Sequence, residues 1–188
     1  MARPKVAYSR NHTRDIAASL KRERPDLDPT DYLYLLYAQR VGRILNSVDD
    51  AYCRAECGVS AAEMRVLFAL RRASPLYALR PTELFRSLLV TSGAITKQVD
   101  RLIVAGYVDR RPGPDKSGGF LIHLTDKGFK VADDALTALA DSSIVSHSAL
   151  TAKERQTACK LLAKMLRDLE ERFCEDDPQS GDEGRCRS

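Results

Sequence analysis

The chain has 188 residues, of which 44% are hydrophobic, so it can form one domain, or one domain with an appendage, around a real core. Its formal net charge of +4 permits a nucleic-acid partner but excludes the extreme basicity of histone-like proteins. No apolar run approaches the roughly 18 residues of a membrane-spanning helix, and the N-terminus lacks the apolar core of a secretory signal. The five cysteines include no CxxC pair. We therefore expect a cytoplasmic protein in a reducing environment.

Residues 1–24 form a basic segment with seven lysines or arginines and two acidic residues. The segment has no strong apolar period, which favours a solvated, partly disordered arm; the alternative is an arm that follows DNA phosphates. Residues 14–23 are compatible with a short helix. The sequence PDLDPT at 25–30 ends any such helix and prepares the next one.

Residues 31–57 are predicted to form one long helix, and Gly58 suits the position just after its end. Arg40 and Arg43 flank its apolar face, where such side chains usually extend to solvent but sometimes bind a carboxylate in a cleft. The apolar positions at helical spacing are Leu33, Leu36, Tyr37, Val41, Ile44, Leu45, Val48 and Tyr52.

Ser60 and Glu63 have the spacing of a capping box, so a second helix begins there and runs to about Ala73, before Ser74-Pro75. Its apolar face is predicted to contain Met64, Leu67, Phe68 and Leu70.

Two short helices are predicted next, within residues 80–126. Pro81 suits a first helical position, because its missing N–H would be unpaired there. Thr91 is the expected N-cap of the second helix. The apolar residues are Leu84, Phe85, Leu88 and Leu89 in the first helix and Ile95, Val99, Leu102 and Ile103 in the second.

The second helix of this pair has another stripe without large apolar side chains. It consists of Gly93, Thr96, Lys97 and Asp100, with Ser92 at the start of the helix. Such a face fits the DNA major groove, where hydroxyls and lysines reach phosphates and base edges.

A hairpin is predicted after the helix ends near Gly106. Residues 107–111 form one strand and residues 120–124 its partner, and the turn-rich PGPDKSGG between them includes Lys116. A helix pair followed by a hairpin with basic residues is the outline of a winged helix-turn-helix. The alternative is an ordinary helical hairpin beside a β-ribbon that packs on another domain.

The C-terminal part is predicted to be helical. Thr125 caps a helix that runs from Asp126 towards Ser146, with Phe129, Val131, Leu136 and Leu139 on its apolar side. Thr151 and Glu154 form a second capping box before a terminal helix. That helix either folds back on its own core or makes an interface between subunits. Its apolar stripe comprises Ala158, Leu161, Leu162, Met165, Leu166, Leu169 and Phe173.

An enzyme is not indicated, since the sequence contains no GxSxG, no GxGxxG after a strand and no P-loop. The three histidines, at positions 12, 123 and 147, lack HExxH spacing, and cysteines and histidines do not cluster at zinc-ligand spacing. His123 is interpreted as a surface residue of the hairpin. We expect no cofactor and no metal.

The order of these elements, and LLVTSGAITKQVDRLIVAGYVDRRPGPD followed by LIHLTDKG, resemble the MarR family of bacterial transcriptional regulators. The resemblance is specific over 80–128, and the architecture fits over 31–173. It implies a mainly α protein with a small β-wing that forms a homodimer through its N- and C-terminal helices. It also implies that each subunit reads half of a pseudo-palindromic operator, that promoter occlusion represses transcription, and that a small aromatic or anionic ligand binds in a cleft.

On this basis the chain divides into a basic N-terminal extension (1–30, partly disordered), a helical dimerisation region (31–58 and 125–174), a winged helix-turn-helix DNA-binding domain (59–124) and a disordered tail (175–188). The residues predicted to contact double-stranded DNA are Thr91, Ser92, Gly93, Thr96, Lys97, Gln98, Arg101, Arg110, Arg111 and Lys116.

The wing departs from the family pattern at one position. Gly118 stands where the family usually has an arginine that enters the minor groove or pairs with the aspartate corresponding to Asp100. This wing is therefore expected to read DNA weakly, with Lys116, Arg110 and Arg111 replacing part of the missing charge.

The ligand is expected to be a phenolic or aromatic carboxylate, or its CoA thioester, with Tyr37, Arg40, Arg43, Met64 and Phe68 as candidate lining. The urate-responsive branch of the family has a tryptophan in its first helix, and this chain has none.

A peroxide-responsive branch of the family uses a reactive cysteine. Cys53 and Cys57 lie at the C-terminal end of helix 31–57, where the helix dipole disfavours a thiolate, although Arg54 acts in the opposite direction. Two alternatives stay open: a cysteine-based redox-sensing regulator, and a winged-helix protein-interaction module that binds no DNA.

Overall fold

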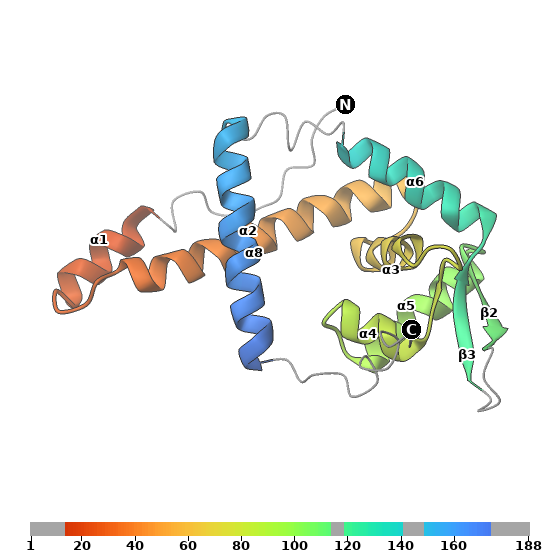
Figure 1. Cartoon of the computed structure of the whole chain (residues 1–188). Coiled ribbons are helices and arrows are strands. Elements are labelled where there is room, and N and C mark those ends of the chain that lie inside the picture. The colour runs from red at the N-terminus through yellow and green to blue at the C-terminus, as the bar shows by residue number, and fades with distance from the viewer. Residues whose placement is uncertain (1–13, 114–118, 141–148, 174–188) are drawn as a thin grey trace, which may run out of the picture. The chain divides into compact units, whose positions relative to one another are not determined.

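The computed structural model describes residues 14–113, 119–140 and 149–173. The chain divides into two compact units, residues 1–139 and residues 140–188. The described residues are mainly helical with one small antiparallel sheet, which confirms the predicted fold class (Figure 1). The predicted arm before residue 14, the wing tip with Lys116 and Gly118, and the tail 175–188 lie outside the described residues.

The elements follow one another in the predicted order, with one additional short strand. They are α1 (Arg14–Glu23), α2 (Thr30–Tyr52), η1 (Cys53–Cys57), α3 (Ala61–Arg72), β1 (Ala78–Leu79), α4 (Pro81–Ser87), α5 (Ser92–Val104), β2 (Val108–Pro112), β3 (Phe120–Leu124), α6 (Asp126–Ala140) and α8 (Ala152–Phe173).

The long helix predicted over 31–57 is present, and its last turn is wound as the π-helical segment η1. Gly58 then adopts a left-handed conformation with φ of 69°, as expected for a residue that ends a helix. The capping box of α3 is also present: the Ser60 hydroxyl accepts from the Glu63 N–H, and the Glu63 carboxylate accepts from the Ser60 N–H at 2.7 Å. These local bonds set where α3 begins.

Helices α4 and α5 form the predicted helix-turn-helix. Pro81 is the first residue of α4, and the Thr91 hydroxyl accepts from the Ala94 N–H at 3.3 Å. The assignment of Leu89 to the apolar face of the first helix is wrong. Leu89 lies after the end of α4, has a positive φ of 52° and is 70% exposed. It belongs to the turn, where it follows the C-cap residue Leu88 in the left-handed conformation that commonly ends a helix.

The sheet has the strand order β1-β3-β2, and both pairings are antiparallel. The hairpin of β2 and β3 was predicted, with one residue of difference in the first strand. Strand β1 was not predicted, because two residues cannot display an alternating pattern. It pairs Ala78 with His123 and Leu79 with Ile122.

The hydrophobic core lies where α3 meets α4, α5, the sheet and α6. Its fully or nearly fully buried side chains include Met64, Val66, Leu67 and Leu70 from α3, Leu84 from α4, Ile95, Val99 and Leu102 from α5, Val108 and Ile122 from the sheet, and Ala132 and Ala135 from α6. The apolar stripe predicted for α5 therefore holds this helix against α3 and leaves its other face outward.

The first turn of helix α6 contacts the C-terminal end of α5. The Thr125 hydroxyl accepts from the Gly128 N–H at 3.1 Å, as predicted for a cap. Lys127 donates to the Ala105 carbonyl at 2.7 Å and lies over the Tyr107 ring, with 4.5 Å from Nζ to the centroid. The predicted continuation of this helix towards Ser146 falls on residues outside those described.

Helix α8, in the second unit, begins with the predicted capping box. The Thr151 N–H donates to the Glu154 carboxylate at 2.7 Å, and the Glu154 N–H donates to the Thr151 hydroxyl at 3.3 Å. None of its residues is buried, and Leu161 and Leu162 of its apolar stripe are 63% and 55% exposed. In the part of the chain that the structure describes, every helix is too short or too polar to cross a membrane.

Candidate nucleic-acid interface and ligand pocket

The outward face of α5 carries the side chains that the sequence assigned to DNA. Ser92, Gly93, Thr96 and Lys97 are exposed, and Gln98 is half-buried. A Cβ added at Gly93 would meet no atom within 4 Å, so this surface is open to a close approach. The Thr96 hydroxyl donates to the Ser92 carbonyl at 3.0 Å and keeps its lone pairs available as acceptors.

The start of α5 is electrostatically suited to an anion. Its first turn contains no acidic residue, and the unpaired N–H groups of a helix N-terminus attract phosphates. Thr91, one of the predicted DNA contacts, uses its hydroxyl as the cap. The N-terminal end of α5, with Ser92 and Lys97, is thus more favourable for contact with the DNA backbone than its C-terminal end.

The wing arginines lie in ion pairs, and Arg110 joins the wing to the helix. Its guanidinium lies 2.6 Å from the Asp100 carboxylate of α5 and over the Phe120 ring, 5.2 Å from the centroid. Arg111 pairs with Asp109 at 2.9 Å and remains 56% exposed. Because an exposed pair contributes little, Arg111 can exchange its partner for a phosphate.

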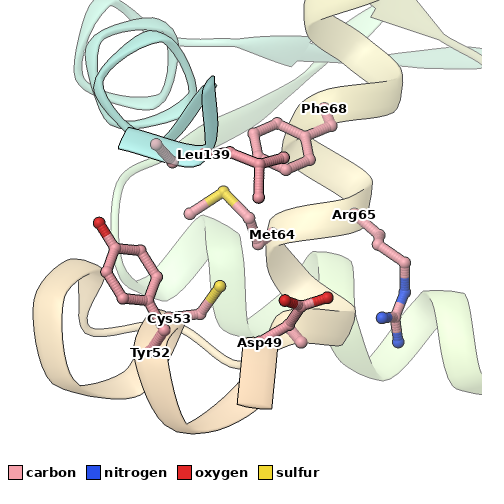
Figure 2. A pocket seen from close by; sticks show the side chains of 9 residues that line it. Asp49, Tyr52, Cys53, Met64, Arg65, Phe68 and Leu139 are labelled. Atoms are coloured by element: carbon pink, nitrogen blue, oxygen red, sulfur yellow. The ribbon is translucent and has the colours of Figure 1, made fainter. Parts of the chain in front are cut away.

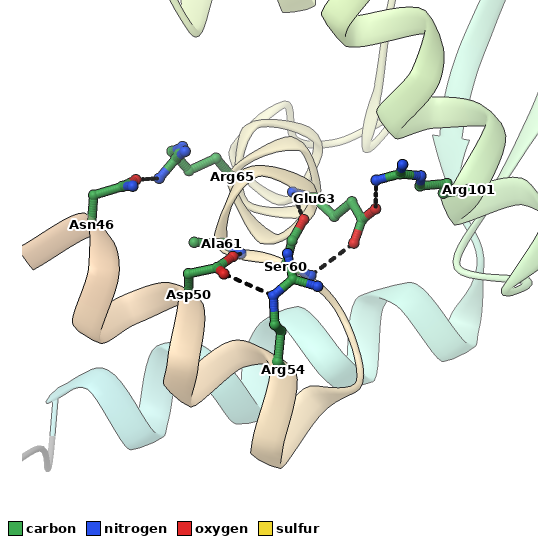
Figure 3. Close-up of polar contacts among 8 residues, drawn as sticks. All are labelled: Asn46, Asp50, Arg54, Ser60, Ala61, Glu63, Arg65 and Arg101. Atoms are coloured by element: carbon green, nitrogen blue, oxygen red, sulfur yellow. Dashed lines mark hydrogen bonds and ion pairs between the residues drawn. The ribbon is translucent and has the colours of Figure 1, made fainter. Parts of the chain in front are cut away.

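A network of polar contacts surrounds the start of α3 (Figure 3). Asp50 accepts from the Ala61 N–H at 2.9 Å and from Arg54 at 2.7 Å. These two bonds, that of Arg54 first, lower the pKa of Asp50 below its usual value. Asp50 therefore stays charged at neutral pH and ties the end of α2 to the first residue of α3.

Two further contacts in Figure 3 reach away from this junction. Arg65 donates to the Asn46 side chain at 2.9 Å, and Arg101 of α5 lies 3.6 Å from the Glu63 carboxylate. The second contact is an ion pair between the helix predicted to read DNA and the start of α3.

A pocket of about 210 Å³ lies between the end of α2, α3 and α6. Figure 2 shows Phe68 and Leu139 on one side of it and Tyr52 and Cys53 on the other, with Met64 between them. The complete lining is Asp49, Tyr52, Cys53, Ala61, Met64, Arg65, Phe68, Ala135 and Leu139.

The sequence-based pocket and the observed pocket share Met64 and Phe68. Tyr37, Arg40 and Arg43 do not line this pocket, and their assignment to a ligand site stays a prediction. They lie on earlier turns of α2, six to twelve residues before Asp49, which is roughly 9 to 18 Å along a helix axis. The spacing of Asp49, Tyr52 and Cys53, which places them on one helix face, was the available signal for the side of this pocket that comes from α2 and η1.

Burial governs the ionisation of the pocket. It raises the pKa of Asp49, against the lowering effect of the Arg65 charge, and it raises the pKa of the Cys53 thiol to about 11. Burial also raises the pKa of Cys57, with the Glu56 charge acting in the same direction. Arg54, expected to favour a thiolate, instead pairs with Asp50. Both thiols are therefore protonated at neutral pH.

Mild peroxide is expected to leave DNA affinity unchanged, because at a pKa of about 11 only on the order of one Cys53 in ten thousand is thiolate at pH 7. The measurement is operator binding before and after peroxide treatment, with Cys53→Ser as the matched control. The redox-sensing alternative would be established if peroxide abolished operator binding, dithiothreitol restored it, and the Cys53→Ser variant kept its binding in peroxide.

The fold and the exposed face of α5 define a winged helix-turn-helix protein. The sequence model of the MarR family matches residues 58–116. The chain is 30% identical over 142 residues to the multiple antibiotic resistance protein MarR of Escherichia coli, covering 75% of this chain and 93% of that protein. It is 27% identical over 156 residues to the HTH-type transcriptional regulator PecS of Dickeya dadantii, covering 82% of this chain and 93% of PecS.

Solved structures agree with these matches. Sco5413, a MarR family transcriptional regulator from Streptomyces coelicolor, has a TM-score of 0.65 at 27% identity, over 77% of this chain and 98% of that one. A cysteine-to-serine mutant of E. coli MarR, complexed with operator DNA, has a TM-score of 0.58 at 30% identity, over 76% and 97%. The chain belongs to the MarR family of transcriptional regulators.

Proposed function

We propose that this protein is a ligand-responsive repressor that binds a pseudo-palindromic operator as a homodimer and is released by a small aromatic or anionic ligand. The observation that carries the proposal is the outward face of α5, with exposed Ser92, Thr96 and Lys97 beside an open Gly93. The E. coli relative complexed with operator DNA supports it, at 30% identity. Because its proposed partner is the chromosome, the protein acts in the cytoplasm.

The DNA contacts divide into two roles. The start of α5 lies in the major groove, as is usual for recognition helices, and Ser92, Thr96, Lys97 and Gln98 supply base and phosphate contacts there. The wing supplies sequence-independent affinity through Arg111, and through Lys116 outside the described residues. Arg110, which pairs with Asp100, chiefly fixes the wing against α5.

Lys97→Ala is expected to weaken operator binding in one of two ways. A lost phosphate contact weakens binding to all DNA sequences alike. It also reduces the salt slope, which is the slope of the logarithm of affinity against the logarithm of salt concentration, by about one. A lost base contact costs about 1–3 kcal/mol and relaxes one operator position. The measurement is competition between operator and random duplex at two salt concentrations, with the upstream region of the protein's own gene as operator.

Arg111→Ala is the matched control for this experiment, because it should lower affinity with little loss of discrimination. If Lys97→Ala and Thr96→Ala leave both affinity and discrimination unchanged, α5 is not the reader. The protein-interaction module then becomes the better interpretation.

A second copy of the chain is the proposed partner of two exposed apolar surfaces. Tyr37 and Val41 of α2 are 45% and 55% exposed, and Leu162 and Leu166 of α8 are 55% and 49% exposed. Surfaces of this kind are typical of interfaces, and a two-fold dimer would bury the same residues of both subunits.

The pocket is the proposed ligand site. Phe68, Met64 and Leu139 offer an apolar surface to one aromatic ring, and Arg65 provides a cation for a carboxylate or for a phosphate of a CoA thioester. Arg65 replaces the predicted Arg40 and Arg43 in this role.

Salicylate is therefore expected to raise the melting temperature of the protein and to lower its affinity for the operator. Arg65→Gln should weaken the effect of salicylate by several-fold and leave the weaker effect of phenol unchanged, because phenol has no carboxylate. Thermal melts measure the melting temperature and gel shifts measure the operator affinity, each across a titration of salicylate or phenol. An equal loss for both compounds would remove Arg65 from the ligand site.

A further inference from the structure

The contact between Arg101 and Glu63 joins two helices that are distant in sequence. Arg101 lies on α5 and Glu63 in the first turn of α3, and the guanidinium and carboxylate are 3.6 Å apart (Figure 3). The Arg101 side chain is 72% exposed, whereas that of Glu63 is 10% exposed. The carboxylate is thus the buried member of the pair and the arginine the solvent-facing one.

Glu63 is held in place independently of Arg101. Its Oε2 atom accepts from the Ser60 N–H at 2.7 Å, and its own N–H donates to the Ser60 hydroxyl at 3.2 Å. This reciprocal cap fixes the carboxylate and leaves Oε1 to face Arg101. A fixed acceptor at the start of α3 can therefore orient a mobile arginine on α5.

Arg101 also lies far from the end of α5 that suits DNA. It follows Ser92 by nine residues, or roughly 14 Å along the helix axis. Recognition helices make base contacts mainly with their N-terminal residues, so the position of Arg101 favours a role inside the protein.

We propose that Arg101 is a positioning residue, which holds α5 against the start of α3 through Glu63 and does not contact DNA. This proposal rests on the proposed DNA-binding function, and it revises the sequence-based prediction for Arg101. Because Arg101 is well exposed, the pair contributes modestly, and its loss is expected to lower operator affinity roughly two- to five-fold.

Four proteins test the proposal: wild type, Glu63→Gln, Arg101→Gln and the double variant. Glutamine at position 63 keeps an acceptor for the Ser60 N–H, so the cap survives while the charge is lost. We expect both single variants to lower operator affinity by a similar factor, the double variant to be no weaker than either, and the salt slope to stay at its wild-type value.

A DNA contact by Arg101 would give a different pattern. Arg101→Gln would then reduce the salt slope by about one. It would also lower operator affinity by the same factor whether position 63 is Glu or Gln. Either result overturns the proposal. Lys97→Gln is the control for a contacting cation, since it is expected to reduce the affinity or the slope in both backgrounds.

A measurement without DNA separates this proposal from the proposed function. Amide NMR spectra of the four proteins report the environment of residues 92–98. Glu63→Gln should shift these amides in the presence of Arg101 and leave them unshifted in the Arg101→Gln background. Shifts of equal size in both backgrounds, or none in either, overturn the positioning role even if the wild-type protein binds no DNA.

Discussion

Gly128→Ala is expected to destabilise the protein by more than about 3 kcal/mol, a large fraction of the 5–15 kcal/mol of a typical domain. An added Cβ would lie 2.0 Å from the Tyr107 carbonyl oxygen, 2.9 Å from the Tyr107 carbonyl carbon and 3.0 Å from Leu124 Cδ2. The carbonyl cannot move away freely, because it accepts from the Thr125 N–H at 3.1 Å. The first turn of α6 would have to leave the end of α5.

Urea unfolding followed by circular dichroism measures this effect. Gly93→Ala is the matched control, because a Cβ there meets no atom within 4 Å. On helix propensity alone it is expected to leave stability unchanged or raise it by up to about 1 kcal/mol. If Gly128→Ala unfolded within about 1 kcal/mol of the wild type, the contact between α6 and Tyr107 would not be the tight junction described above.

Leu162→Glu combined with Leu166→Glu is expected to convert the proposed dimer into a monomer or an aggregate and to abolish operator binding. Each leucine buried in an interface contributes about 1.5–3 kcal/mol, and a charge in its place adds a desolvation cost. One subunit presents one reading head, so a monomer would hold only half of the operator.

Light scattering gives the oligomeric state, and gel shifts give the DNA affinity. Lys164→Glu, a charge reversal on the polar side of the same helix, should leave the dimer intact. A chain that ends at Ser148 should behave like the double leucine variant. A well-folded dimer from that truncation would show that α8 is not part of the interface.

Most of the helix starts could be predicted from the sequence because they depend on bonds between residues three apart. The caps by Ser60, Thr91, Thr125 and Thr151 are all present at the predicted positions. The hairpin of β2 and β3 was equally accessible, since two strand-like segments separated by glycine- and proline-rich turn residues indicate a hairpin. The MarR family membership followed from this same local order of elements.

The sites depended on contacts between residues distant in sequence. The pocket forms only where α2, α3 and α6 converge. Arg40 and Arg43, which were proposed because they flank the apolar face of the long helix, do not line it, whereas Arg65 does. Strand β1 pairs with β3 more than forty residues later and has no periodicity of its own.

The ion-pair partners of two other arginines likewise depend on the tertiary structure. Sequence position led to the prediction that Arg101 and Arg110 contact DNA, because both are basic, Arg101 lies on α5 and Arg110 lies in the adjoining wing. Packing places each beside a carboxylate, Arg110 with Asp100 and Arg101 with Glu63, 38 residues earlier in the chain. A residue's charge can be known from its type alone, but the partner of that charge is known only once the helices have packed.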